Sequence, residues 1–108
     1  MNQSVLEIPV LEIVHLQTDD FKRVFKFLKP DGTYFNIDDT DPVLTISKSG
    51  TVILTFEGSD FTKTLNSEIV LKKPSSVFAG MDCLTDYTFR FFDRTSNSTL
   101  VKGPFKIV

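Results

Sequence analysis

Apolar and polar residues alternate along most of this chain, and turn-forming residues interrupt the alternation roughly every 8 to 12 positions. A period of two is typical of half-buried β-strands, and strands at this spacing are typical of a sandwich or barrel. The pattern predicts an all-β fold, an immunoglobulin-like antiparallel β-sandwich of seven or eight strands with one short helical turn near 59–66.

A first hairpin is expected between residues 21 and 37. Phe21, Phe25 and Phe27 share one face of the first strand, opposite its lysines. The run 29–32, Lys-Pro-Asp-Gly, suits a tight turn, because proline presets one backbone angle and glycine accepts positive φ. The return strand 33–37 then places Phe35 and Ile37 inward.

A second hairpin is predicted over residues 44–56, with its turn at Lys48-Ser49-Gly50 and an inward set of Val52, Leu54 and Phe56. The helical turn follows it. Ser59 or Asp60 can cap its start, and Phe61 and Leu65 are spaced for one helical face.

The later strands are expected at 67–72, at 87–92 and near the carboxyl terminus. Tyr87, Phe89 and Phe91 form one inward set, and Phe105 and Ile107 form another. Asp93 to Thr99 is a polar turn between them.

The segment from Leu6 to Leu16 is apolar on both faces and is divided by Pro9, which cannot donate to a strand ladder. Residues 1–17 are therefore either a docking strand or arm, or an ordinary first strand of a single domain spanning 1–108. For the docking hypothesis, the protein-interface residues are Val5, Leu6, Ile8, Val10, Leu11 and Ile13.

Composition narrows the function classes. The chain has 108 residues, 41% of them hydrophobic, and 12 basic against 14 acidic residues give a net charge of −2. Nucleic-acid binding needs a concentrated basic stripe, which this balance does not supply, and an anionic membrane surface is disfavoured for the same reason. The amino terminus lacks the features of a signal peptide, so synthesis in the cytoplasm is expected.

No catalytic residues are predicted. His15 is the one histidine available as a general base, and its apolar neighbours favour a partly buried imidazole instead. Cys83 lies near Asp82 and Asp86, which disfavour a reactive thiolate, and a small hydrophobic role is expected.

No metal or cofactor site is predicted either. One cysteine and one histidine do not make a zinc site. Asp38, Asp39 and Asp41 could hold calcium, but a solvated acidic turn is favoured because a dedicated loop's glycine and glutamate are missing. The five glycines, Gly103 among them, are isolated turn or bulge positions rather than a phosphate loop.

The order of these landmarks resembles a known family. It runs from the 21–27 strand through Pro30-Asp31-Gly32, a Gly50-Thr51-Val52 strand and Tyr87–Phe91 to the closing 103–108 segment. Over residues 18 to 108 it resembles the immunoglobulin-like sandwich at the amino terminus of bacteriophage baseplate upper proteins and of related small phage tail and head proteins.

The resemblance implies a non-enzymatic virion structural protein, located in the virion after synthesis in the host cytoplasm. It would dock to the capsid, as a head decoration or auxiliary protein, or to the tail or baseplate. Its expected partners are other virion proteins or further copies of itself. The alternative is a carbohydrate- or protein-binding β-sandwich module, for which Tyr34, Ile53 and Phe92 are the outward aromatic or large apolar candidates.

Overall fold

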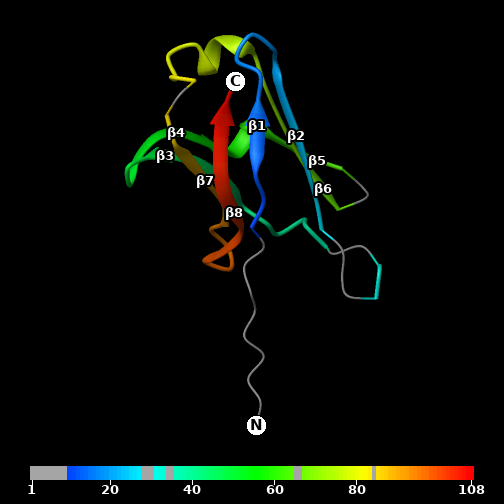
Figure 1. Cartoon of the computed structure of the whole chain (residues 1–108). Helices are drawn as coiled ribbons and strands as arrows, with labels where there is room; N and C mark the ends of the chain where they lie inside the picture. Colours follow the sequence, from blue (N-terminus) through cyan, green and yellow to red (C-terminus); the bar gives the residue numbers. More distant parts are fainter. Residues whose placement is uncertain (1–9, 28–30, 34–35, 65–66, 84) are drawn as a thin grey trace.

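The computed structural model describes residues 10–27, 31–33, 36–64, 67–83 and 85–108. In this part of the chain eight strands form two β-sheets that pack against each other (Figure 1). The predicted all-β sandwich is therefore confirmed. None of the helices in the described ranges is long and apolar enough to cross a membrane.

The larger sheet has five strands in the order β1-β8-β7-β3-β4. Their bounds are β1 Ile13–His15, β3 Pro42–Lys48, β4 Thr51–Glu57, β7 Tyr87–Asp93 and β8 Ser98–Ile107. β1 runs parallel to β8, whereas the other neighbours are antiparallel. The short strand β1 is therefore one edge of this sheet, and β4 is the other.

The smaller sheet has three antiparallel strands in the order β2-β6-β5. Their bounds are β2 Phe21–Lys26, β5 Phe61–Lys63 and β6 Glu68–Lys73. Two short 3₁₀ turns complete the fold, η1 at Gly58–Asp60 and η2 at Ser75–Phe78.

The strand order identifies an immunoglobulin-like sandwich. That fold has strands B, E and D in one sheet and G, F and C in the other, and the variable type adds C′ beside C. Here β2-β6-β5 and β8-β7-β3-β4 reproduce these sheets in chain order. Tyr87 forms the tyrosine corner typical of the fold, because its hydroxyl accepts a 2.8 Å hydrogen bond from the backbone N–H of Asp82, five residues upstream.

Phenylalanine rings connect the two sheets. Phe25 of β2 and Phe91 of β7 stack with their ring centroids 4.3 Å apart, and Phe61 of β5 lies 5.8 Å from Phe91. In antibody domains a disulfide joins the strands equivalent to β2 and β7. This chain has a single cysteine, so ring packing joins the sheets there.

The later strands agree with the sequence pattern. β6 lies within one residue of the predicted range, and both predicted inward sets on β7 and β8 are buried. Phe91 and Phe105 are fully enclosed, and Ile107 is nearly so.

The second hairpin is confirmed, with one correction. Ser49 and Gly50 both have positive φ, 52° and 82°, which is the geometry of a type I′ turn. The register then skips Ile53, a bulge that shifts the preceding residue to the opposite face. Val52 was expected inward, but its side chain is 52% exposed on the outer face.

The first hairpin is wrong in the described residues, because Thr33, Asn36 and Ile37 of its predicted return strand belong to no strand. β2 pairs with β6, and its last residue, Lys26, lies opposite Glu68. The chain instead crosses from the smaller to the larger sheet between β2 and β3 (Figure 1). Ile37 is buried in the core as expected, whereas Phe35 lies outside the described residues. Local turn chemistry is compatible with a tight return, but it carries no information about which strand is the partner.

The helical turn begins where expected and is shorter. After η1, residues Phe61–Lys63 form β5, because Phe61 pairs with Leu71 and its ring enters the core. The turn η2 was not foreseen, although its Phe78 is fully buried.

Candidate docking surface

Strand β1 is held on β8 by a parallel ladder that continues beyond the strand at both ends. The backbone N–H of Leu11 donates to Lys102 C=O, and that of Gln17 donates to Val108 C=O, each at 2.9 Å. Val108 N–H in turn donates to His15 C=O at 2.9 Å. Because backbone groups alternate in direction along a strand, those of the even-numbered residues between Leu11 and Gln17 point away from β8. The Leu16 C=O accepts a 3.0 Å hydrogen bond from the Asp19 N–H, and the other groups form an open sheet edge in the described part of the chain.

Gly103 makes the amino-terminal part of this ladder, at Leu11, possible. A Cβ atom built on Gly103 would lie only 1.9 Å from the carbonyl oxygen of Leu11. A glycine in a strand often marks such a close backbone approach. Gly103 was expected to be a turn or bulge position, but it lies within β8 and admits the segment that precedes β1.

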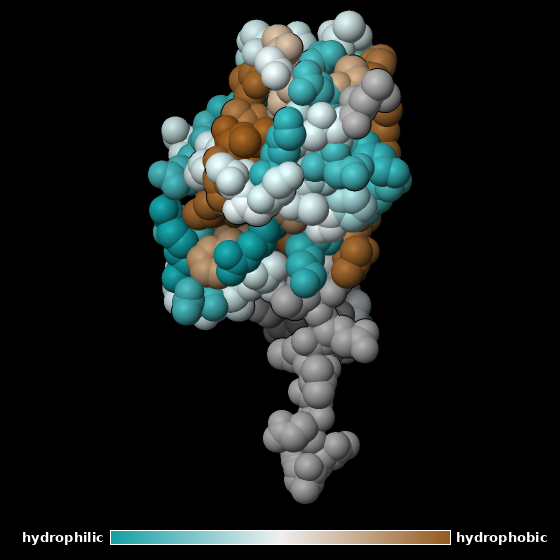
Figure 2. Space-filling view, turned by 60° about the vertical axis from the view of Figure 1, so that its left-hand side comes forward, coloured by the Kyte–Doolittle hydropathy of each residue, from teal (hydrophilic) through white to brown (hydrophobic). Residues whose placement is uncertain are grey.

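Aliphatic side chains gather along this edge. Val10, Leu11, Val14, Leu16 and Val108 are between 43% and 70% exposed, and we call this set the β1 edge surface. Figure 2 shows apolar side chains reaching the surface in separate groups among hydrophilic ones on the face that it draws. Single exposed aliphatic residues are ordinary, but a series along one open strand edge is typical of a protein-binding site.

The predicted interface residues fall into three groups. Val10 and Leu11 belong to the β1 edge surface, whereas Ile13 is fully buried and contributes to the core instead. The first three of the set, at positions 5, 6 and 8, lie outside the described residues.

Sequence reasoning missed Val14, Leu16 and Val108. The period of two could have identified Val14 and Leu16. Ile13 and His15 point inward, so the residues that alternate with them must point outward.

An ion pair lies within the β1 edge surface. Glu12 Oε2 and Lys106 Nζ are 3.1 Å apart, and both side chains are about half exposed. The pair connects the residue before β1 to β8 and lies between the apolar side chains.

The outer face of the larger sheet is hollowed beside this edge, in a cavity of about 580 Å³. Val10 and Val52 contribute apolar sides. Thr45, Thr88, Arg90 and Lys102 also line it. Among the described residues the lining carries two cationic side chains and no acidic one, which favours a polar or acidic occupant over a purely apolar one.

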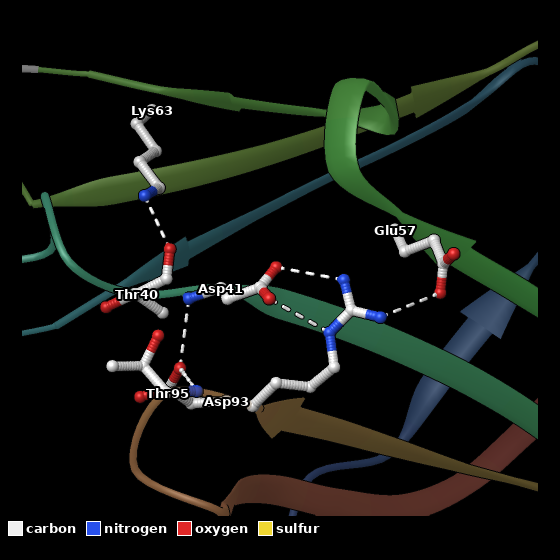
Figure 3. A network of polar contacts seen from close by, with 7 residues as sticks. Thr40, Asp41, Glu57, Lys63, Asp93 and Thr95 are labelled. Carbon is white, nitrogen blue, oxygen red and sulfur yellow. Dashed lines mark hydrogen bonds and ion pairs between the residues drawn. The ribbon is translucent and has the colours of Figure 1, made fainter.

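A polar network lies where β3 begins and β4 and β7 end (Figure 3). Arg94 binds both oxygens of Asp41, with Nε at 3.0 Å and Nη2 at 3.1 Å, and its Nη1 lies 3.3 Å from Glu57. Hydrogen bonding to Asp41 raises the pKa of Arg94 above its ordinary value. Lys63 Nζ donates to the Thr40 carbonyl oxygen at 2.5 Å.

This network bears on the calcium alternative. Both oxygens of Asp41 face Arg94, so that carboxylate is engaged by a cationic side chain, while Asp38 and Asp39 are exposed. Within the described ranges, no three potential metal ligands are grouped together.

Asp93 organises the turn between β7 and β8. Its carboxylate accepts hydrogen bonds from the backbone N–H groups of Asp41 and Thr95 at 2.9 and 3.0 Å and from the Ser96 hydroxyl at 2.8 Å. Burial pushes the pKa of Asp93 upward, but these hydrogen bonds outweigh it and hold the pKa below its ordinary value.

Replacing Asp93 by asparagine is therefore expected to lower the free energy of unfolding at pH 7 by about 1–2 kcal/mol. A carboxyl group with a depressed folded-state pKa stabilises the fold above its unfolded pKa of 3.8, and this contribution disappears as the pH falls below that value. Urea denaturation between pH 3 and pH 7 should show the two proteins converging in acid. Asp39→Asn, in an exposed side chain, is the matched control, and parallel pH profiles for Asp93→Asn and wild type would contradict the assignment.

The two candidate reactive residues are placed differently. The His15 ring is buried against Phe21 and Phe78, with ring centroids 5.1 and 4.9 Å away. Burial lowers the pKa of His15, the Asp19 carboxylate opposes this shift, and Arg23 adds to it. Cys83 was expected to act as a small hydrophobic residue, and its side chain is exposed.

The glycan alternative depends on exposed aromatic rings. In the described part of the chain, the exposed large apolar side chains are all aliphatic. Phe92 is half-buried under Arg90, whose guanidinium carbon lies 4.2 Å from the ring centroid. Ile53 is 41% exposed, and Tyr34 lies outside the described residues.

No protein family and no curated protein matches this sequence at a significant level. Among solved structures, the chain is similar to the extracellular domain of mouse leukocyte-associated immunoglobulin-like receptor 1, described as a strand-swapped dimer. The identity is 10%, the match covers 100% of this chain and 97% of that one, and the TM-score is 0.46.

A second similar structure is the extracellular domain of the voltage-gated sodium channel β4 subunit, described as a parallel homodimer, with 11% identity, coverage of 99% and 92%, and a TM-score of 0.49. The natural killer cell receptor NKp44 follows, with 10% identity, coverage of 95% and 100%, and a TM-score of 0.38. Likeness at this level is too distant to indicate function, and the fold assignment rests on the strand order of the chain itself.

Proposed function

We propose that this chain is a non-enzymatic docking domain of a bacteriophage particle and that its β1 edge surface binds another virion protein. The observation that carries the proposal is the open edge of β1, where Val14 and Leu16 are each nearly half exposed. The assignment to a phage particle is supported by the resemblance of residues 18–108 to phage virion sandwiches, and the proposal covers both capsid and tail partners.

Strand addition explains how such an edge would bind. An incoming extended segment gains main-chain hydrogen bonds from the open backbone groups, and alternate side chains give specificity. On the outer face, Val14, Leu16 and Val108 would lose apolar surface to water. Arg90 and Lys102 in the neighbouring hollow favour a partner segment that carries acidic residues.

The contacts of the two reactive residues support a non-enzymatic function. His15 is enclosed by aromatic rings, and the Sγ of Cys83 lies 3.3 Å from the amide oxygen of Gln17. Neither contact provides the base that an activated nucleophile needs.

The test compares two double variants during infection by the phage that encodes the chain. Val14→Glu with Leu16→Glu adds charge to the β1 edge, whereas Ile53→Glu with Thr55→Glu adds the same charge to exposed positions of the opposite edge strand, β4. Tagged copies are expressed from a plasmid, and their amount in purified particles is measured by quantitative mass spectrometry. We expect the amount of the β1 variant in particles to be about tenfold or more below that of the wild type, because charged groups would be buried without partners.

Three results would count against the proposal. Absence of the wild-type chain from particles contradicts the virion assignment, and equal incorporation of both variants contradicts the choice of surface. Loss of the β4 variant alone would move the binding site to the other edge of the sheet.

A further inference from the structure

The tetrapeptide Val-Leu-Glu-Ile occurs twice near the amino terminus, at residues 5–8 and 10–13, with Pro9 between the two copies. The second copy lies on β8, and each of its contacts is made by a residue that the first copy repeats. Leu11 donates its N–H to Lys102 C=O, Glu12 pairs with Lys106, and Ile13 is fully buried. Moving the amino-terminal segment by five residues along β8 would bring the leucine, glutamate and isoleucine of the first copy to the positions that those of the second copy occupy.

Pro9 is compatible with this shift. It would take the position of Val14, which lies opposite Lys106 on β8. The N–H of Val14 points away from β8, because the odd-numbered residues Leu11 and Gln17 donate to that strand. Proline is tolerated on an edge strand where the missing N–H would face outward.

The shift would also replace the buried histidine. Val10 would take the position of His15, whose Nε2 is buried without a hydrogen-bond partner. The charged groups that act on His15 are Asp19, in the connection to β2, and Arg23, on β2 itself. Phe21 and Phe78 present uncharged rings to it. Valine carries no proton, so the shifted strand would remove an ionisable group from this aromatic environment.

Gln17 favours the strand position seen in the structure. Its Nε2 donates to the carbonyl oxygens of Phe78 and Met81 at 3.1 and 2.6 Å. The shift would place Glu12 there, and a carboxyl group can donate a hydrogen bond only when it is protonated. Two groups, His15 and Glu12, therefore make the balance between the two positions depend on pH in the same direction.

We propose that acidification moves the amino-terminal strand by five residues along β8, so that residues 5–8 replace residues 10–13. His15 sets the direction of this pH dependence. Its folded-state pKa lies below the ordinary value of 6.5, so the buried position loses stability as the pH falls below about 6.5. The expelled residues 13–17 join the connection to β2. The proposal concerns the isolated domain and does not require the docking partner.

Amide hydrogen exchange measured by NMR at pH 7 and pH 5 tests the shift. At pH 7 the amides of Leu11 and Gln17 should be protected, since both donate to β8. At pH 5 protection should move to Leu6 and Glu12, with a gain of about tenfold or more in their protection factors. Leu11 and Gln17 should lose protection to the same extent.

Two variants separate the shift from general acid loosening. Ile8→Asp should block it, because aspartate cannot fill the buried place of Ile13, so Leu6 and Glu12 stay unprotected at pH 5. His15→Val removes the buried ionisable group and leaves Glu12, so Leu11 and Gln17 should lose clearly less protection at pH 5 than in the wild type. Unprotected Leu6 and Glu12 amides in the wild type at pH 5 would overturn the proposal. Loss of protection throughout β3 and β7 at pH 5 would also overturn it, because the shift requires a folded sandwich.

Discussion

Replacing Phe91 by alanine is expected to lower the free energy of unfolding by about 3–5 kcal/mol, the usual cost of removing a large buried aromatic ring. Phe91 is completely enclosed and packs against rings from both β2 and β5. It therefore joins the two sheets between the same pair of strands that a disulfide connects in antibody domains. Urea denaturation followed by circular dichroism measures the loss.

Phe92→Ala is the matched control, because the next ring along β7 is half-buried on the outer face under Arg90. Its truncation should cost no more than about 1 kcal/mol, the value of a partly exposed cation–π contact. Similar losses for the two variants would show that Phe91 has no special part in joining the sheets.

Gly103→Ala is expected to lower the free energy of unfolding by about 2–3 kcal/mol, toward the upper end of the cost of overpacking. The added methyl group would lie 1.9 Å from the carbonyl oxygen of Leu11, which cannot move aside without leaving β8. The variant should detach residues 10–12 and expose the Leu11 amide to exchange, while the β3–β7 ladder remains protected.

Gly80→Ala provides the control for Gly103→Ala. A Cβ atom on Gly80 meets nothing within 4 Å, so that variant should change stability by no more than about 0.5 kcal/mol. An unchanged Leu11 amide in Gly103→Ala would contradict the close approach between the two segments. Because the same approach positions the β1 edge surface, the variant should also weaken incorporation into particles if the proposed docking function holds.

Alternation along β7 was sufficient to predict which of its side chains enter the core, whereas along β4 the bulge moved Val52 to the outer face. Tyr87, Phe89 and Phe91 are all buried, because a strand with one face on the core must place every second residue inward. The hairpin of β3 and β4 was also predictable, since its strands are adjacent in the sequence and Ser49-Gly50 accepts the positive φ values of its turn.

Contacts between distant segments decided the rest. The partner of β2 is β6, more than forty residues away in the sequence. The turn-like residues after β2 do not indicate this pairing. Phe61 follows a helix-like signal but becomes a strand residue, because its pairing with Leu71 buries its ring.

For the docking surface, the sequence by itself determined that the amino-terminal segment is apolar on both faces and that Pro9 divides it. Only the tertiary structure decided which of its residues meet water. β8 binds the segment in a register that buries Ile13 and His15, so Val14 and Leu16 are left outside. That register depends on Gly103, ninety residues further along the chain, because only a residue without a side chain lets the two backbones approach so closely.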